Sequence, residues 1–215
     1  MPRTPTPRQL ATALDDHRER LAACRRCVNA PDVVPIVSLA RAPRAMLVGQ
    51  APGQTERGGG RPFAGRAGTT LFKWLHVAGL DEDSARRFFY ISAITRCYPG
   101  PHAGGRGDRV PSPAERERCG DWLDDELRII RPRLIIPVGR LAIERFVGVQ
   151  ALSDVVGREH EVHHQGGASI VIPLPHPSGA SSWIHQPGHM DLLHQSLALL
   201  SVHVSALGIR SRSVA

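Results

Sequence analysis

Short apolar runs alternate with helical segments along the chain, and this order limits the fold more than any other feature. Runs that are typical of buried strands span 45–49, 88–95, 134–138 and 169–173. Helical spacing or helix-entry signals are found at 6–24, 69–80, 113–130, 140–147 and 189–207. A repeated strand–loop–helix order predicts an α/β fold with an open, mostly parallel four-stranded sheet and helices on both faces.

Nothing in the sequence divides the chain into separate units. It contains no internal repeat and no long low-complexity linker, so we expect residues 1–215 to form a single domain. Residues 1–40 would contribute an N-terminal helix with the first two cysteines, and residues 209–215 a flexible tail. No apolar run approaches the roughly 18 residues that a membrane span requires. The N-terminus lacks the apolar core of a signal peptide. We therefore expect a cytoplasmic protein that does not bind membranes.

The charge of the chain points to a partner. The formal net charge is +7, from 27 basic and 20 acidic residues, and Lys73 is the only lysine. A GC-rich genome explains the preference for arginine over lysine but not the surplus of positive charge. A basic surface favours a polyanion, because neutralising phosphates releases counterions. Nucleic acid is the leading partner class, which would place the protein at the nucleoid.

Three loops rich in glycine, proline and arginine leave the predicted strands. They span 49–68, 96–113 and 173–188, and the first holds seven glycines. In open parallel sheets, ligands bind beyond the carboxyl ends of the strands. We expect one site that collects all three loops.

The four cysteines are Cys24, Cys27, Cys97 and Cys119. Two close cysteines and two distant ones suit a four-thiolate metal centre, either zinc or an iron–sulphur cluster, and spacing alone does not separate these. Disulfides are rare in cytosolic proteins. Unrelated buried cysteines are an equal alternative on this pattern.

Four motifs in chain order resemble the uracil-DNA glycosylase superfamily, within it the iron–sulphur branches called families four and five. They are GQAPG at 49–53, RPFAGRAG at 61–68, VPSPAERERC ending at Cys119, and HPSGAS at 176–181. The resemblance spans most of the chain, from Cys24 to the final helix. It implies that the four cysteines hold a 4Fe-4S cluster, with zinc as the less expected occupant.

The resemblance also implies an activity and a partner. The protein would be a monomeric, monofunctional DNA glycosylase of base-excision repair. It would flip uracil out of single- or double-stranded DNA and hydrolyse the N-glycosidic bond, leaving an abasic site. Such an enzyme needs a pocket with an aromatic face, groups that read the base edge, and a donor for the charge on the departing base.

Several residues match these needs. Phe63 would supply the stacking face, and Gly49, Gln50 and Ala51 would bring backbone amides and a side chain to the base. His176 is the first catalytic candidate, because an imidazole aimed at the base O2 stabilises the leaving anion. One such donor typically lowers the barrier by about 3–4 kcal/mol.

The chain lacks the usual water-activating carboxylate of the resembled families. Gln50 stands where family four tends to have glutamate, and Ala51 where another branch has aspartate. Glu56 in the first loop and Asp108 in the second are the nearest carboxylates, and either is a candidate base. We place Gln50 and Glu56 with His176 as catalytic candidates.

The chain also lacks the usual asparagine that reads the base. Ala93 stands near its place, and the only asparagine of the chain is Asn29. Gln50, Gln54, backbone amides or Asp108 would then read the base. Hypoxanthine or xanthine are alternative substrates. Alternative functions are a binder of abasic or damaged sites that does not cut, and a redox-sensing DNA-binding module.

The remaining candidates would contact DNA. Ser178 and Ser181 would hold phosphates, and Trp183 or Ile184 would wedge into the stack that the flipped base leaves. Arg106 and Arg109, in a basic loop, would contact phosphate as well.

Overall fold

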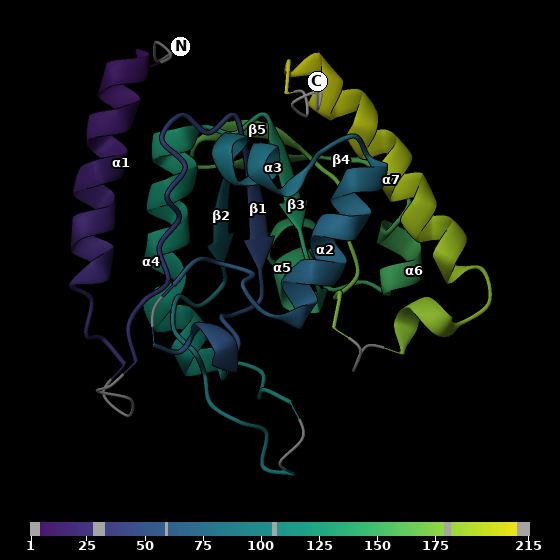
Figure 1. Ribbon diagram of the computed structural model, residues 1–215, viewed down its shortest axis with the longest axis horizontal. Helices are drawn as coiled ribbons and strands as arrows, with labels where there is room; N and C mark the ends of the chain where they lie inside the picture. The colour runs from purple at the N-terminus through teal and green to yellow at the C-terminus, as the bar shows by residue number, and fades with distance from the viewer. Residues whose placement is uncertain (1–4, 28–32, 59, 105–106, 179–181, 210–215) are drawn as a thin grey trace.

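The computed structural model describes residues 5–27, 33–58, 60–104, 107–178 and 182–209 (Figure 1). Its centre is a five-stranded sheet in the order β2-β1-β3-β5-β4. The strands are β1 (Ala45–Gly49), β2 (Phe89–Ala93), β3 (Leu134–Pro137), β4 (His160–His164) and β5 (Gly167–Val171). All neighbouring pairs are parallel except β4 and β5, which are antiparallel. The predicted α/β fold with an open, mostly parallel sheet is confirmed.

The sequence underestimates the number of strands by one. The predicted strand at 169–173 is β5, and the additional strand β4 pairs with it at the edge of the sheet. The sequence of β4 is HEVHH, and its side chains alternate between half-buried and exposed. A polar edge strand of this kind carries no apolar run, so hydrophobic patterning does not find it.

Helices cover both faces of the sheet, as predicted. They are α1 (Pro7–Ala22), α2 (Arg66–Val77), α3 (Glu82–Phe88), α4 (Pro113–Ile130), α5 (Arg140–Val147), α6 (Leu152–Val155) and α7 (His189–Ala206). Two short 3-10 helices, η1 (Gln54–Glu56) and η2 (Trp183–His185), lie in loops. In the described part of the chain, no helix is both long and apolar enough to cross a membrane.

Local chemistry explains the two best-defined helix starts. The side chains of Thr6 and Ser112 cap α1 and α4, each in a reciprocal capping box with the residue three positions on. A proline at the first turn of each helix adds to the signal. The seven-residue α3 is too short to show a helical period in the sequence, and it was not expected.

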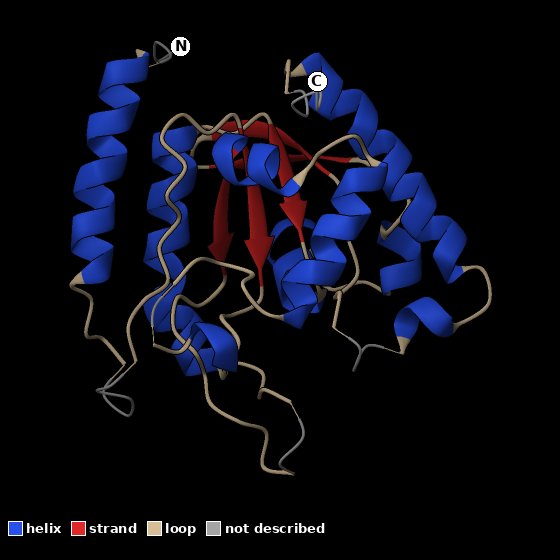
Figure 2. Ribbon diagram, in the orientation of Figure 1, coloured by secondary structure: helices blue, strands red, loops and turns tan. Residues whose placement is uncertain are grey.

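The core has one layer on each side of the sheet. On one side, a single buried cluster joins Leu71 and Leu75 of α2 and Leu197 of α7 with Ile91 of β2. The other side joins α1, α4 and α5 to the sheet. Figure 2 shows the loops that leave the carboxyl ends of β1 and β2 at one end of these layers, and the segment after β5 reaches the same end, where Leu174 pairs with Val138 just beyond β3. The fold therefore brings the three predicted loops to one place.

Candidate active site at the carboxyl ends of the strands

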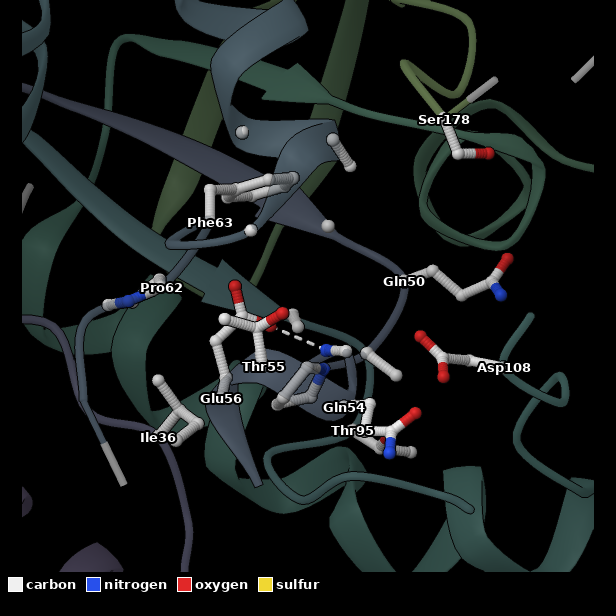
Figure 3. A pocket seen from close by; sticks show the side chains of 18 of the residues that line it. Ile36, Gln50, Gln54, Thr55, Glu56, Pro62, Phe63, Thr95, Asp108 and Ser178 are labelled. Atoms are coloured by element: carbon white, nitrogen blue, oxygen red, sulfur yellow. Dashed lines mark hydrogen bonds between the residues drawn. The ribbon is translucent and has the colours of Figure 1, made fainter. Parts of the chain in front are cut away.

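A cavity of about 530 Å³ lies at the carboxyl ends of β1 and β2. Three loops contribute to its lining: residues 49–56, 62–63 and 65–68 from the first, 107–108 from the second, and 176 and 178 from the third. Ile36, the end of β2 (91–93) and residues 95–96 complete it. Figure 3 shows Phe63 on one side of this pocket, with Gln50 and Asp108 at its opening. The three loops thus form one site.

The ring of Phe63 lies over the end of β1. A Cβ atom built on Gly49 would come within 2.8 Å of Phe63 Cζ, closer than real Cβ contacts allow. The backbone of Phe63 has φ of 54°, in the left-handed region that a bulky residue rarely adopts. Such strain persists only where neighbouring groups hold it.

Three neighbours hold the Phe63 segment. A Cβ on Gly68 would lie 1.9 Å from the Phe63 carbonyl oxygen, so only glycine fits there. Arg86 of α3 donates to the carbonyl oxygen of Pro62 at 2.8 Å and to that of Phe63 at 3.3 Å. These contacts bind the segment to α2 and α3.

Glu56 supplies the third contact. Its side chain is buried, at 6% exposure, and it accepts hydrogen bonds from the backbone N–H of Gly53 at 2.5 Å and of Ala64 at 2.7 Å. The two bonds use different carboxylate oxygens. Glu56 therefore links the loop after β1 to the segment that carries Phe63, a geometry that suits holding loops rather than taking a proton from water.

His176 lies on the third loop, and one of its ring nitrogens already takes part in hydrogen bonds with Ser178. The backbone N–H of Ser178 donates to His176 Nδ1 at 3.2 Å, and Ser178 Oγ lies 2.8 Å from the same atom. Since a backbone N–H can only donate, Nδ1 is an acceptor and the proton of the neutral ring is on Nε2. Burial lowers the pKa of His176, partly opposed by the charge of Asp108. The ring is a neutral Nε2–H donor at pH 7.

Gly139 allows His176 to sit at the end of β3. Its φ is 86°, and a Cβ there would lie 2.8 Å from His176 Cδ2. Its N–H donates to the carbonyl of Leu174, just before the His176 motif. This glycine was not singled out from the sequence, although its place directly after a strand is a usable signal.

Asp108 and Gln50 face each other at the opening of the pocket (Figure 3). Asp108 is exposed and comes close to the first loop, with Oδ2 3.2 Å from where a Cβ of Gly53 would be. Ala51, beside Gln50, also lines the pocket. Among the described lining residues, Asp108 and Glu56 are the only carboxylates.

The residues predicted to contact DNA have different surroundings in the structure. Arg109 forms a two-bond ion pair with Glu115 at 2.5 and 2.7 Å, which holds the pKa of Glu115 near 2. Trp183 is half-buried and stacks on His189 with ring centroids 4.1 Å apart. Ser178 bonds to His176 as above. Arg106 and Ser181 lie outside the described residues.

The four cysteines gather beside the pocket. Cys27, Cys97 and Cys119 line a second cavity of about 320 Å³, and Cys24 packs in the apolar cluster that contains Cys119. All four are free thiols. Burial and the thiols of Cys27, Cys119 and Cys24 raise the pKa of Cys97 to about 12. Four thiols from three separate segments therefore lie within electrostatic range of one another.

Their spacing bears on the group they would hold. Over the described residues, no three His, Cys, Asp or Glu side chains are arranged as ligands of a single metal ion. Zn–S bonds of about 2.3 Å in a tetrahedron require thiolates within about 4 Å of one another. Thiols of Cys27, Cys97 and Cys119 around one cavity, with Cys24 nearby, are a donor set that suits either a zinc ion or an iron–sulphur cluster.

The amino-acid sequence of the chain is similar to those of known proteins. The family model described as the uracil DNA glycosylase superfamily matches residues 37–198. The type-4 uracil-DNA glycosylase of Archaeoglobus fulgidus is 33% identical over 174 residues, covering 77% of this chain and 82% of the relative. That of Thermotoga maritima is 33% identical, covering 63% and 65%. That of Sulfurisphaera tokodaii is 27% identical, covering 85% and 81%.

Proposed function

The chain belongs to the uracil-DNA glycosylase superfamily, and from this premise we propose that it removes uracil from DNA by hydrolysing the N-glycosidic bond. The observation that carries the proposal is the meeting of Phe63 and His176 in one pocket at the carboxyl ends of the strands. The first offers an aromatic face and the second a hydrogen-bond donor. The sequences of the type-4 relatives support the same activity.

The base reaches this pocket by leaving the DNA stack. A base inside a duplex is inaccessible, so the nucleotide is extruded and its ring is stacked on an aromatic side chain. Phe63 presents such a face beside Gly49. Backbone amides of Gln50 and Ala51, at the end of β1, lie close enough to the pocket to contact the base.

His176 stabilises the departing base. As the bond between C1′ and N1 stretches, negative charge moves onto the uracil ring and its O2 atom. A neutral Nε2–H, oriented by the Ser178 contacts at Nδ1, donates to that oxygen. Ser178 is then a positioning residue for His176.

Asp108 is our candidate for handling water. Water attacks C1′ while the bond to N1 breaks, and a carboxylate accepts the proton that the water loses. Glu56 already accepts from two backbone N–H groups. Asp108 is the remaining carboxylate in the described lining and is exposed at the opening. Glu56 instead positions Phe63.

Cys24, Cys27, Cys97 and Cys119 are the residues that would hold a 4Fe-4S cluster. Bound there, the cluster supplies a structural brace, since hydrolysis transfers no electrons. The thiols come from the N-terminal segment, the loop after β2 and helix α4. The backbone N–H of Arg96 already donates to Cys119 Sγ at 3.3 Å. Arg96 lines the active-site cavity as well, so the brace adjoins the pocket.

The surplus of basic residues supports DNA as the partner. Our candidates for DNA contacts outside the pocket remain Arg106, Arg109, Ser181 and Trp183. We propose that the protein acts as a monomer, because one domain is enough to flip one nucleotide. Its proposed location is the cytoplasm, at the nucleoid.

Single-turnover cleavage of a labelled oligonucleotide with one uracil tests the function. Alkali treatment should give strand breaks at uracil and none at cytosine, with hypoxanthine as the alternative substrate. His176→Ala should lose the breaks while His203→Ala, a matched change on α7, keeps them. Retention of abasic DNA without any base release would favour a binding protein instead.

A further inference from the structure

A basic groove lies at the end of the sheet opposite the active-site pocket. It is a cavity of about 530 Å³ between the segment that leads into β1 and the end of α3. Arg44 and Phe88 directly precede β1 and β2, and the backbone N–H of Arg44 donates to the carbonyl of Phe88 at 2.8 Å. The basic groove is therefore at the amino ends of these strands, whereas the pocket is at their carboxyl ends (Figure 1).

The lining of the basic groove has a strong excess of positive charge. Half of its lining residues are arginines, the other half are apolar, and none is acidic. The arginines are Arg41, Arg44, Arg86 and Arg87. Arg86 pairs with Glu82 at 2.8 Å, but no carboxylate of the described residues forms an ion pair with the other three. Like charges that lie this close repel one another, so the basic groove favours a ligand with negative charge.

The ring of Phe88 orients two of these arginines. The guanidinium carbons of Arg44 and Arg87 lie 5.6 and 5.2 Å from the centre of this half-buried ring. Contact with a ring limits the motion of a guanidinium without using its N–H groups as donors to oxygen. Arg44 uses one of them on the carbonyl of Leu207 at 2.8 Å. Arg41 and Arg87 are exposed, so a ligand in solution can reach their N–H groups.

A phosphodiester backbone supplies the chemistry that fits these residues. A guanidinium presents its N–H groups as a fork that matches two phosphate oxygens. The family to which the chain belongs acts on DNA, so backbone phosphates are the polyanion that the protein meets. Strands of five residues are about 17 Å long, so a straight duplex seated over the pocket does not reach the basic groove at the other end.

We propose that the basic groove is a second DNA-binding site, which binds the phosphate backbone of a DNA segment other than the one at the pocket. Arg41 and Arg87 donate to the phosphates, and Arg44 adds positive charge. A chain with two such sites bridges two DNA segments and can pass from one to the other without leaving DNA. The inference goes beyond the proposed function, because it does not depend on which base the pocket accepts.

The test asks whether one chain binds two duplexes. Short duplexes without uracil, one carrying a donor dye and one an acceptor dye, are mixed in excess with the protein at low salt. Energy transfer reports that two duplexes are held together, and sedimentation gives the number of chains in the complex. The variant is Arg41→Gln with Arg87→Gln. Arg8→Gln with Arg158→Gln removes the same charge at exposed positions outside the basic groove.

Wild type should give energy transfer in a complex of one chain with two duplexes. The groove variant should still bind one duplex but bind the second more weakly, by on the order of tenfold. Its affinity for the second duplex should also depend less on salt, with a log–log slope smaller by about 2. The control variant should bridge like wild type. Arg41→Lys with Arg87→Lys keeps the charge and should retain most of the bridging.

Three results would overturn the inference. They are a wild type that binds only one duplex, energy transfer that arises only from paired chains, and a groove variant that bridges as well as wild type. Thermal unfolding checks folding, and the groove variant should melt within a few degrees of wild type because it loses no ion pair. Uracil release is measured separately, so bridging without cleavage would contradict the proposed function while supporting the second site.

Discussion

The ring of Phe63 packs against the α-carbon of Gly49, so tightly that a single added methyl group would come within 2.8 Å of Cζ. The ring is thereby fixed at the end of β1, next to the first loop of the pocket. Its backbone has φ of 54°, so the ring cannot easily retreat without changing the whole segment. The stacking surface depends on contacts made by its neighbours.

Gly49→Ala should therefore displace the Phe63 ring and slow uracil release. Shifts of about 1 Å at a reacting centre cost on the order of 100-fold in rate. Single-turnover cleavage would measure the loss. Gly58→Ala is the matched control, since a Cβ on Gly58 meets nothing within 4 Å. Equal rates for the two variants would show that the ring position does not limit the reaction.

Glu56→Gln should act through Phe63. A glutamine offers one oxygen and one NH₂ group to the two N–H donors of Gly53 and Ala64, so one contact becomes a repulsion. Hydrogen bonds to charged groups contribute about 1.5–3 kcal/mol, which predicts a melting temperature lower by several degrees. Glu117→Gln, exposed on α4, is the control.

The pH–rate profile separates positioning from catalysis. If Glu56 positions the loop, Glu56→Gln lowers the rate by the same factor at every pH. If Glu56 is the catalytic base, the variant loses the acidic limb of the profile.

The features predicted correctly are those that leave a pattern of apolar residues or glycines in the sequence. The parallel core strands, the faces covered by helices and the meeting of three loops in one pocket all follow from such patterns. The polar strand β4 and the short helix α3 carry no such pattern and were missed.

Side-chain contacts that depend on how the chain folds back on itself could not be predicted from the sequence. Glu56 was a candidate base on its nearness to the first motif, but its bond to Ala64 depends on how the first loop folds back on itself. Nothing in the sequence marks Arg86 as the donor to Pro62 and Phe63. The basic groove is equally invisible in the sequence, because it forms where two distant segments meet. The catalytic and DNA-binding roles stay predictions.

Acid should destabilise the protein through His176. Burial lowers its pKa below the ordinary value of about 6.5, so the folded state binds fewer protons than the unfolded state. Stability from this group is complete above about pH 6.5 and is lost as the pH falls below it. The free energy of unfolding of the wild type should drop more than that of His176→Phe between pH 7.5 and 5.5. An equal drop in both would mean that His176 titrates normally.

Removing one cysteine should release the predicted cluster. The purified protein should be brown, with iron and sulphide in equal amounts, and Cys119→Ser should lose both the colour and stability. Cys119 is buried and its Sγ accepts from Arg96, so the change also disturbs the wall of the active-site cavity. Uracil release should fall together with iron content. A colourless wild type with one zinc per chain would contradict the cluster.

Asp108→Asn tests whether water activation has moved to the second loop. The amide cannot accept the proton that water loses, and general-base catalysis typically contributes 10²–10⁴-fold, so we expect a loss of about 100-fold in single-turnover rate. Binding of 2′-fluorouridine DNA should be nearly unchanged, because Asp108 is exposed at the opening while Phe63 and His176 hold the base. Asp16→Asn, exposed on α1, controls for the lost charge. A variant with the wild-type rate would mean that hydrolysis needs no carboxylate here, and the charge of the DNA phosphates would then be the remaining stabiliser of the sugar cation.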